Sequence, residues 1–102
     1  MAAVLTAKAG TIQFQGHKEC FYNLDMTNVI RYADSMIGMT DLYNVREDGV
    51  KCYGDFVIVA ADLSRHGRFT FVETSLGMGI VLDAHTTNDP ELIDIATTWG
   101  KK

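Results

Sequence analysis

The sequence predicts an all-β domain with one helix, folded as a small closed or nearly closed β barrel. About seven short runs have the period of β-strands, and turn residues separate them every eight to twelve positions or so. Residues 27–37 are the clearest stretch with helical periodicity. A chain of 102 residues is long enough for one core but short for two, so residues 1–102 are expected to form a single domain.

The first predicted element is a hairpin near the N-terminus. Residues 11–15 alternate in the strand period, Gly16 and His17 supply a turn, and residues 18–22 return as the second strand. We expect His17 to be exposed at the tip. A further strand is expected at residues 4–8, and its apolar edge would allow pairing with a second copy of the chain, as a homo-oligomer.

The helix is expected from Thr27 to Ile37. Asp25 or Thr27 can cap its start, and Gly38 suits the left-handed residue at its end. Its apolar positions recur at helical spacing and define the face expected to pack on the sheet: Val29, Tyr32, Ala33, Met36 and Ile37. Methionines on or near this face are also expected in the core, as fillers of irregular gaps: Met26, Met36 and Met39.

A second hairpin is expected after the helix, because residues 42–46 and 50–53 flank an Asp-Gly turn. Residues 56–61 form the next apolar strand. Residues 68–73 alternate with their phenylalanines on one side, and a glycine-bearing bend leads into the strand at residues 80–82.

Three of the expected strands bring an aspartate to their end or just past their last apolar residue. Asp62 follows residues 56–61, Asp83 follows residues 80–82, and Asp94 lies between two isoleucines. A carboxylate beside β-branched apolar residues is costly to bury unless something is gained. Aspartate also suits turns, so a purely structural role stays open for Asp62 and Asp83.

The ordered segments Val59-Ala60-Ala61-Asp62, Ile80-Val81-Leu82-Asp83 and Ile93-Asp94-Ile95-Ala96 resemble the 3D domain, a family named for its three aspartates. This family includes the MltA-type peptidoglycan lytic transglycosylases and small secreted Gram-positive relatives. The resemblance covers residues 54–99 and implies a double-psi β barrel with the helix outside it or across one mouth. Where the family has glycine after its second aspartate, this chain has Ala84 and His85.

If the three strand ends converge, their carboxylates cannot all ionise near neutral pH, and Asp94, in the most apolar surroundings, is expected to keep its proton. A protonated carboxylic acid beside ionised ones is equipped to cleave a glycosidic bond. By resemblance, Asp94 is the acid and base, Asp83 supports or orients it, and Asp62 shapes the site. The reaction would cut the MurNAc–GlcNAc bond of peptidoglycan and leave 1,6-anhydro-MurNAc ends.

Further residues are candidates for contact with the glycan. His85, Thr86 and Thr87 follow the second aspartate, although His85 also fits an exposed loop. Exposed aromatics are expected to contribute as well: Tyr43, Tyr53 and Trp99. For Trp99, a stacking platform and a lid over the barrel mouth are both open.

The same residues also fit two alternatives to an enzyme, a non-catalytic module and a metal site. The residues after Asp83 favour a non-catalytic module that binds glycan or protein, or is structural. A divalent metal at Asp62, Asp83, Asp94 and His85 is less favoured, because the spacing matches no calcium loop, and no metal or cofactor is expected. Cys20 and Cys52 lack a nucleophile signature, so buried thiols are expected, with one disulfide allowed.

Composition excludes other classes of protein. The net charge of −4 and the lack of a basic run argue against nucleic-acid binding. No run approaches the roughly 18 apolar residues that a membrane span needs, and the first residues lack the basic segment of a signal peptide. A cell-wall or extracellular location, which the resemblance implies, would then require a longer exported protein or a phage or mobile-element product released on lysis.

Overall fold

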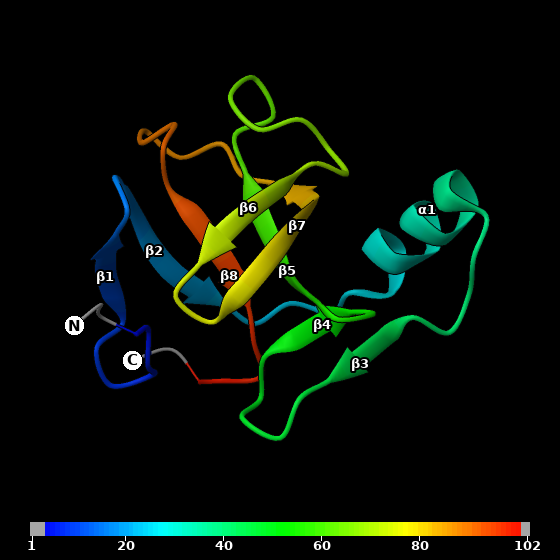
Figure 1. Ribbon diagram of the computed structural model, residues 1–102, viewed down its shortest axis with the longest axis horizontal. Helices are drawn as coiled ribbons and strands as arrows, with labels where there is room; N and C mark the ends of the chain where they lie inside the picture. The colour runs from blue at the N-terminus through cyan, green and yellow to red at the C-terminus, as the bar shows by residue number, and fades with distance from the viewer. Residues whose placement is uncertain (1–3, 101–102) are drawn as a thin grey trace.

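The computed structural model describes residues 4–100, which form a mostly β fold with one helix, as predicted (Figure 1). Helix α1 (Thr27–Ile37) lies between the second and third strands in the chain. The strands are β1 (Thr11–Phe14), β2 (His17–Tyr22), β3 (Tyr43–Val45), β4 (Lys51–Tyr53), β5 (Phe56–Ala61), β6 (Phe71–Thr74), β7 (Gly77–Ala84) and β8 (Ile93–Ala96).

Strand β5 is the centre of the sheet. One of its edges pairs in parallel with β7. Its other edge pairs antiparallel first with β4 and then with β8. Strand β2 runs parallel to β8 and carries β1, β3 extends from β4, and β6 extends from β7. Within residues 4–100 the pairing does not return from one edge to another, so the sheet is open.

The sheet curls strongly, and the side chain of Glu19 on β2 spans the opening. Glu19 accepts hydrogen bonds from Ser75 in the turn between β6 and β7, although β8 and β5 separate β2 from β7 in the pairing order. The concave side holds an inner cluster of apolar residues: Leu5, Phe21, Val50, Cys52, Val57, Val59, Ala61, Val81, Ile93 and Ile95. The convex side and α1 share an outer cluster: Met26, Ala33, Tyr53, Ile58, Ile80, Leu82 and Ala96.

Helix α1 has the predicted bounds, and Gly38 ends it with φ 82°, as expected. The start differs from the prediction, because the N-cap is Met26, which makes no side-chain cap hydrogen bond. The Asp25 carboxylate, one residue before it, accepts bonds from the Thr27 N–H and hydroxyl, at 2.9 and 2.6 Å. The expected core face is only partly correct, because Met36 is 59% exposed and Ile37 is 39% exposed. The helix packs on β7 but extends away from the sheet (Figure 1).

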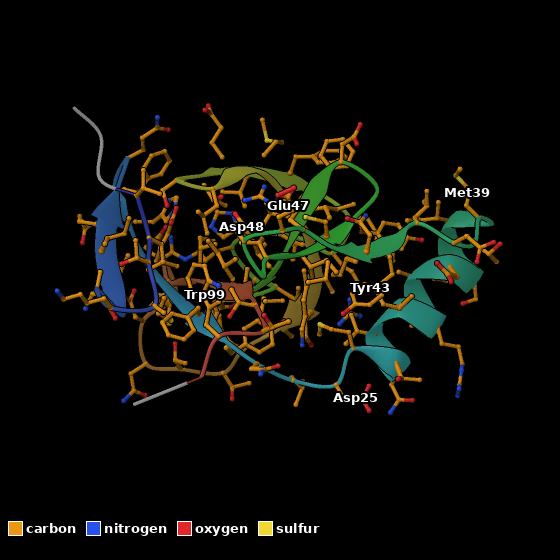
Figure 2. All side chains as sticks on the ribbon, turned by 90° about the horizontal axis from the view of Figure 1, so that it is seen from below. Asp25, Met39, Tyr43, Glu47, Asp48 and Trp99 are labelled. Atoms are coloured by element: carbon orange, nitrogen blue, oxygen red, sulfur yellow. The ribbon has the colours of Figure 1, made fainter. Side chains whose placement is uncertain are left out.

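The methionines near the helix are likewise partly buried in the core and partly exposed. Met26 is buried in the outer cluster, as expected, whereas Met39 is 52% exposed and is labelled at the far end of the helix in Figure 2. The expectation of core packing was therefore wrong for Met36 and Met39. The physical reason is that the sheet does not reach the end of the helix that bears them.

Both predicted hairpins are confirmed, as β1–β2 and β3–β4. The first turn, however, lies at Gln15 and Gly16, and His17 already belongs to β2. The His17 side chain is only 11% exposed, and its Nε2 lies 3.2 Å from Glu19 Oε2. The expectation of an exposed His17 was wrong because the buried Glu19 carboxylate draws the imidazole inward.

Two expected strands need correction. Residues 4–8 form no strand, because the chain turns at residues 7–9 and Leu5 anchors the segment in the inner cluster. Strand β6 begins at Phe71 rather than at Arg68. Phe69 has φ 71°, a left-handed conformation that breaks the alternation, so the two phenylalanines do not share one strand face.

Candidate functional site

Asp83 and Asp94 lie on the two strands that flank the end of β5. Ala60 is the register partner of Asp83 on β7 and of Asp94 on β8. Register partners point to the same face of a sheet, and neighbouring strands lie about 4.8 Å apart. The two carboxylates therefore rise from the convex face, with only the methyl group of Ala60 between their strands.

A β-bulge puts Asp83 on this face. Val59 pairs with Val81, but Ala60 pairs with Asp83, so Leu82 is an extra residue in β7. In regular pairing, Leu82 would oppose Ala60, and Asp83 would point toward the inner cluster. With the bulge, Leu82 packs in the outer cluster and Asp83 lies beside it.

Asp83 is held by a tyrosine from β2. The Tyr22 hydroxyl donates to Asp83 Oδ2 at 3.1 Å, and the Ala84 N–H donates to Oδ1 at 2.9 Å. Burial raises the pKa of Tyr22 well above its usual value, and the negative charges of Asp83 and Asp94 raise it further. Tyr22 therefore stays a hydroxyl donor at any pH near neutral.

Asp94 is contacted by a cysteine from the same strand. Cys20 and Asp94 are register partners across β2 and β8, and the Cys20 thiol donates to Asp94 Oδ1 at 3.2 Å. Residues 20 and 22 share one strand face because side chains alternate. The alternation is visible in the sequence, but the parallel pairing of β2 with β8 is not, so sequence reasoning missed both donors.

Asp62 lies at the same edge of the sheet, immediately after β5, but it serves a turn. Its Oδ1 accepts bonds from the Ser64 N–H at 2.9 Å and the Ser64 hydroxyl at 2.7 Å. These two bonds lower the pKa of Asp62, and the nearby His85 lowers it further. The carboxylate is therefore ionised and engaged in an Asx turn.

His85 closes the loop that leads from β7 to β8. Its Nε2 lies 2.6 Å from the carbonyl oxygen of Leu92, and its Nδ1 lies 3.2 Å from the Thr87 hydroxyl. Its backbone N–H donates to the carbonyl of Ala61 at 3.1 Å. Thr86 and Thr87 are exposed in this loop, which lies at the edge of the sheet that carries Asp62.

The expected aromatic contacts are not gathered at this edge. Trp99 lies beyond the opposite end of β8, where its indole N–H donates to the Asp48 carbonyl at 2.7 Å and its ring meets Phe21 (Figure 2). Tyr53, expected to be exposed, is buried, and its hydroxyl donates to Asp34 at 2.7 Å. The expectation failed because β4 turns Tyr53 toward α1.

Two hollows accompany the helix. A crevice of about 230 Å³ touches Asp83, and its lining residues are Asn28, Val29, Tyr32, Arg68, Leu82 and Asp83. A larger groove of about 680 Å³ lies between α1 and the β3–β4 hairpin and contains none of the three aspartates. Its lining includes Met26, Ile30 and Tyr43, and Figure 2 shows Tyr43 beside the helix. The crevice, although smaller, is the hollow that is open to the aspartate site.

The remaining features bear on metals, thiols and membranes. Within residues 4–100, no group of three or more His, Cys, Asp or Glu side chains is placed to hold a metal ion. Cys20 and Cys52 are present as thiols. In the same part of the chain, no helix has the length and apolar character that a membrane crossing demands.

No family model matches the chain, and no curated protein or solved structure matches it with statistical significance. Membership in the three-aspartate family stays a prediction from the motifs at residues 59–62, 80–83 and 93–96.

Proposed function

We propose that this protein cleaves the MurNAc–GlcNAc bond of peptidoglycan in the manner of a lytic transglycosylase, and that its curled sheet is a variant of the double-psi β barrel. The observation that supports this most is the shared register of Asp83 and Asp94 with Ala60, which gives two carboxylates on one face, of which Asp83 lines an open crevice. A pair of carboxylates on either side of a bound sugar is the usual equipment for glycoside cleavage.

In the proposed reaction, Asp94 gives its proton to the glycosidic oxygen as the C1–O bond breaks, and the negative charge of Asp83 stabilises the oxocarbenium-like transition state. The charged Asp94 then takes the proton from the C6 hydroxyl, whose oxygen closes onto C1. This returns Asp94 to its acid form, consumes no water and gives an anhydro end. Tyr22 and Cys20 hold the two carboxylates in position.

The test is incubation of the purified protein with peptidoglycan sacculi and mass spectrometry of the soluble products. Wild-type protein should release anhydro-muropeptides, and Asp94→Asn should abolish the release while the far-ultraviolet circular dichroism is unchanged. Asp55→Asn, an exposed carboxylate on the β4–β5 turn, is the matched control and should keep full activity. Release of hydrated reducing ends, or full activity in Asp94→Asn, would contradict the proposal.

A second candidate is a non-catalytic module that binds glycan or protein through the larger groove. The groove is favoured by its size, about 680 Å³, and by the apolar and aromatic side chains in its lining, Met26, Ile30 and Tyr43. In this case sacculi or a partner would bind without any product, Tyr43→Ala would weaken the binding, and Asp94→Asn would not.

A further inference from the structure

Arg68 is held in an unusual setting at the aspartate edge of the sheet. Its guanidinium lies over the Tyr32 ring of α1, 5.1 Å from the ring centroid, and the same ring stacks on Phe69 at 6.2 Å and 18°. The segment is fixed to β7, because the Phe69 N–H donates to the Val81 carbonyl at 2.7 Å and the Val81 N–H donates to Thr70 at 2.9 Å. Arg68 is thus positioned by its neighbours rather than by an acidic partner.

Arg68 makes no side-chain hydrogen bond to another residue of the described range 4–100. Its Nε is buried and has no hydrogen-bond partner among residues 4–100. The ion pairs in that part of the chain involve His17 with Glu19, Arg46 with Asp48, and Arg65 with Glu91. A buried N–H group without a partner is costly. Arg68 also lines the crevice, so the guanidinium has N–H donors to offer to a ligand that enters there.

The crevice beside Arg68 has the size and chemistry for one end of an acidic ligand. At about 230 Å³ it is smaller than most small-molecule sites, which span roughly 300–1,000 Å³, so it holds a single group rather than a disaccharide. The planar guanidinium matches a carboxylate. Asp83 and Asn28 can bond O–H or N–H groups next to it, and Val29 and Leu82 supply apolar walls.

We propose that Arg68 binds a carboxylate of the ligand in this crevice, next to Asp83, and so selects acidic glycan strands over neutral ones. The glycan identity rests on the proposed function, whereas the capture of a carboxylate rests on the crevice alone. In peptidoglycan the carboxylate has two sources, the lactyl group of muramic acid that lacks a peptide, and the peptide stem. Both present the same planar anion.

The binding test uses single sugars and a short peptide, followed by amide chemical shifts in the folded protein. N-acetylmuramic acid, which carries the lactyl carboxylate, should shift the resonances of residues 28–32 and 67–70, and N-acetylglucosamine, which lacks it, should not. Shifts with L-alanyl-D-glutamate instead would assign the carboxylate to the peptide stem. If neither acidic ligand shifts these resonances, the proposal fails.

The matched variants separate Arg68 from its neighbours. Arg68→Gln should lower the affinity for the acidic ligand at least tenfold, and Arg68→Lys should recover part of it. Arg65→Gln, an exposed arginine on the same loop that pairs with Glu91 at 2.8 Å, should leave the affinity unchanged. Equal affinity in Arg68→Gln and wild type would overturn the proposal.

Turnover on sacculi keeps the two proposals distinguishable. Arg68→Gln should reduce kcat/KM at least tenfold, mainly through KM, whereas Asp94→Asn should remove turnover and still show the carboxylate-dependent shifts. Cleavage that is unaffected in Arg68→Gln would contradict the role of Arg68 but not the cleavage reaction. Carboxylate binding without any cleavage would support the role of Arg68 and contradict the cleavage reaction.

Discussion

Glu19 and Asp83 are two carboxylates on opposite faces of one sheet, and their surroundings differ. Glu19 is fully buried on the concave side, where Ser75 gives it two hydrogen bonds, at 2.9 and 2.7 Å, and His17 lies at 3.2 Å. Asp83, on the convex side, is partly exposed, is held by Tyr22 and opens onto a crevice. A buried carboxylate with its donors in place stabilises the fold, whereas a partly open one remains available to a ligand.

The largest expected effect concerns Glu19. Glu19→Ala removes a fully buried carboxylate and leaves the partly buried Ser75 donors without an acceptor, so it is expected to lower the free energy of unfolding by about 3 kcal/mol. Asp83→Asn should cost less than about 1 kcal/mol, because Tyr22 can still donate to the amide oxygen. Urea denaturation of both variants measures the difference. An equal loss in the two variants would mean that the carboxylates do not differ in role.

The next largest effect is a loss of stability at high pH, which we expect from Tyr22 on the convex face. The pKa of Tyr22 is raised in the folded state, so the stability it contributes is complete below the unfolded pKa of about 10 and is lost as pH rises above it. The loss is at most about 1.4 kcal/mol per pH unit for this group, and Tyr22→Phe should remove that part of the slope. Urea denaturation between pH 9 and 11 measures it.

Tyr53 provides the control for the alkaline slope. Burial and the bond to Asp34 raise the pKa of Tyr53 to about 12, and this group contributes in wild type and in Tyr22→Phe alike. The difference between these two proteins therefore isolates Tyr22. Identical slopes would show that the Tyr22 hydroxyl is not held beside Asp83.

The smallest effect is expected at Asp62. Asparagine accepts the same bonds from Ser64 in an Asx turn, so Asp62→Asn should change the melting temperature and the release of muropeptides least among the three aspartates. Thermal unfolding and the sacculus assay, run beside Asp83→Asn and Asp94→Asn, check this order. A loss of activity as large as that of Asp94→Asn would give Asp62 a direct part in the site.

Local signals allowed much of the fold to be predicted. The helix bounds follow from periodicity and from Gly38, and the two hairpins follow from their turn residues. Periodicity could not say how far the sheet extends, which is why Met36 was assigned to the core. The open or closed state of the sheet also depends on long-range pairing, which no local pattern specifies.

The candidate site was predictable only in part, for the same reason. The positions of the aspartates at strand ends placed Asp62, Asp83 and Asp94 at one edge. Cys20 and Tyr22 could not be found, because their contacts with Asp94 and Asp83 span 74 and 61 residues and depend on the parallel pairing of β2 with β8.

The bulge in β7 places two consecutive side chains on one surface, which regular alternation does not allow. Leu82 faces the helix and Asp83 faces the open hollow, so a hydrophobic wall and a charge stand next to each other. In a strand without the bulge, neighbouring side chains point to opposite faces, so only one of these two residues could lie on this surface. The chemistry of this edge thus depends on a count of residues as much as on their kind.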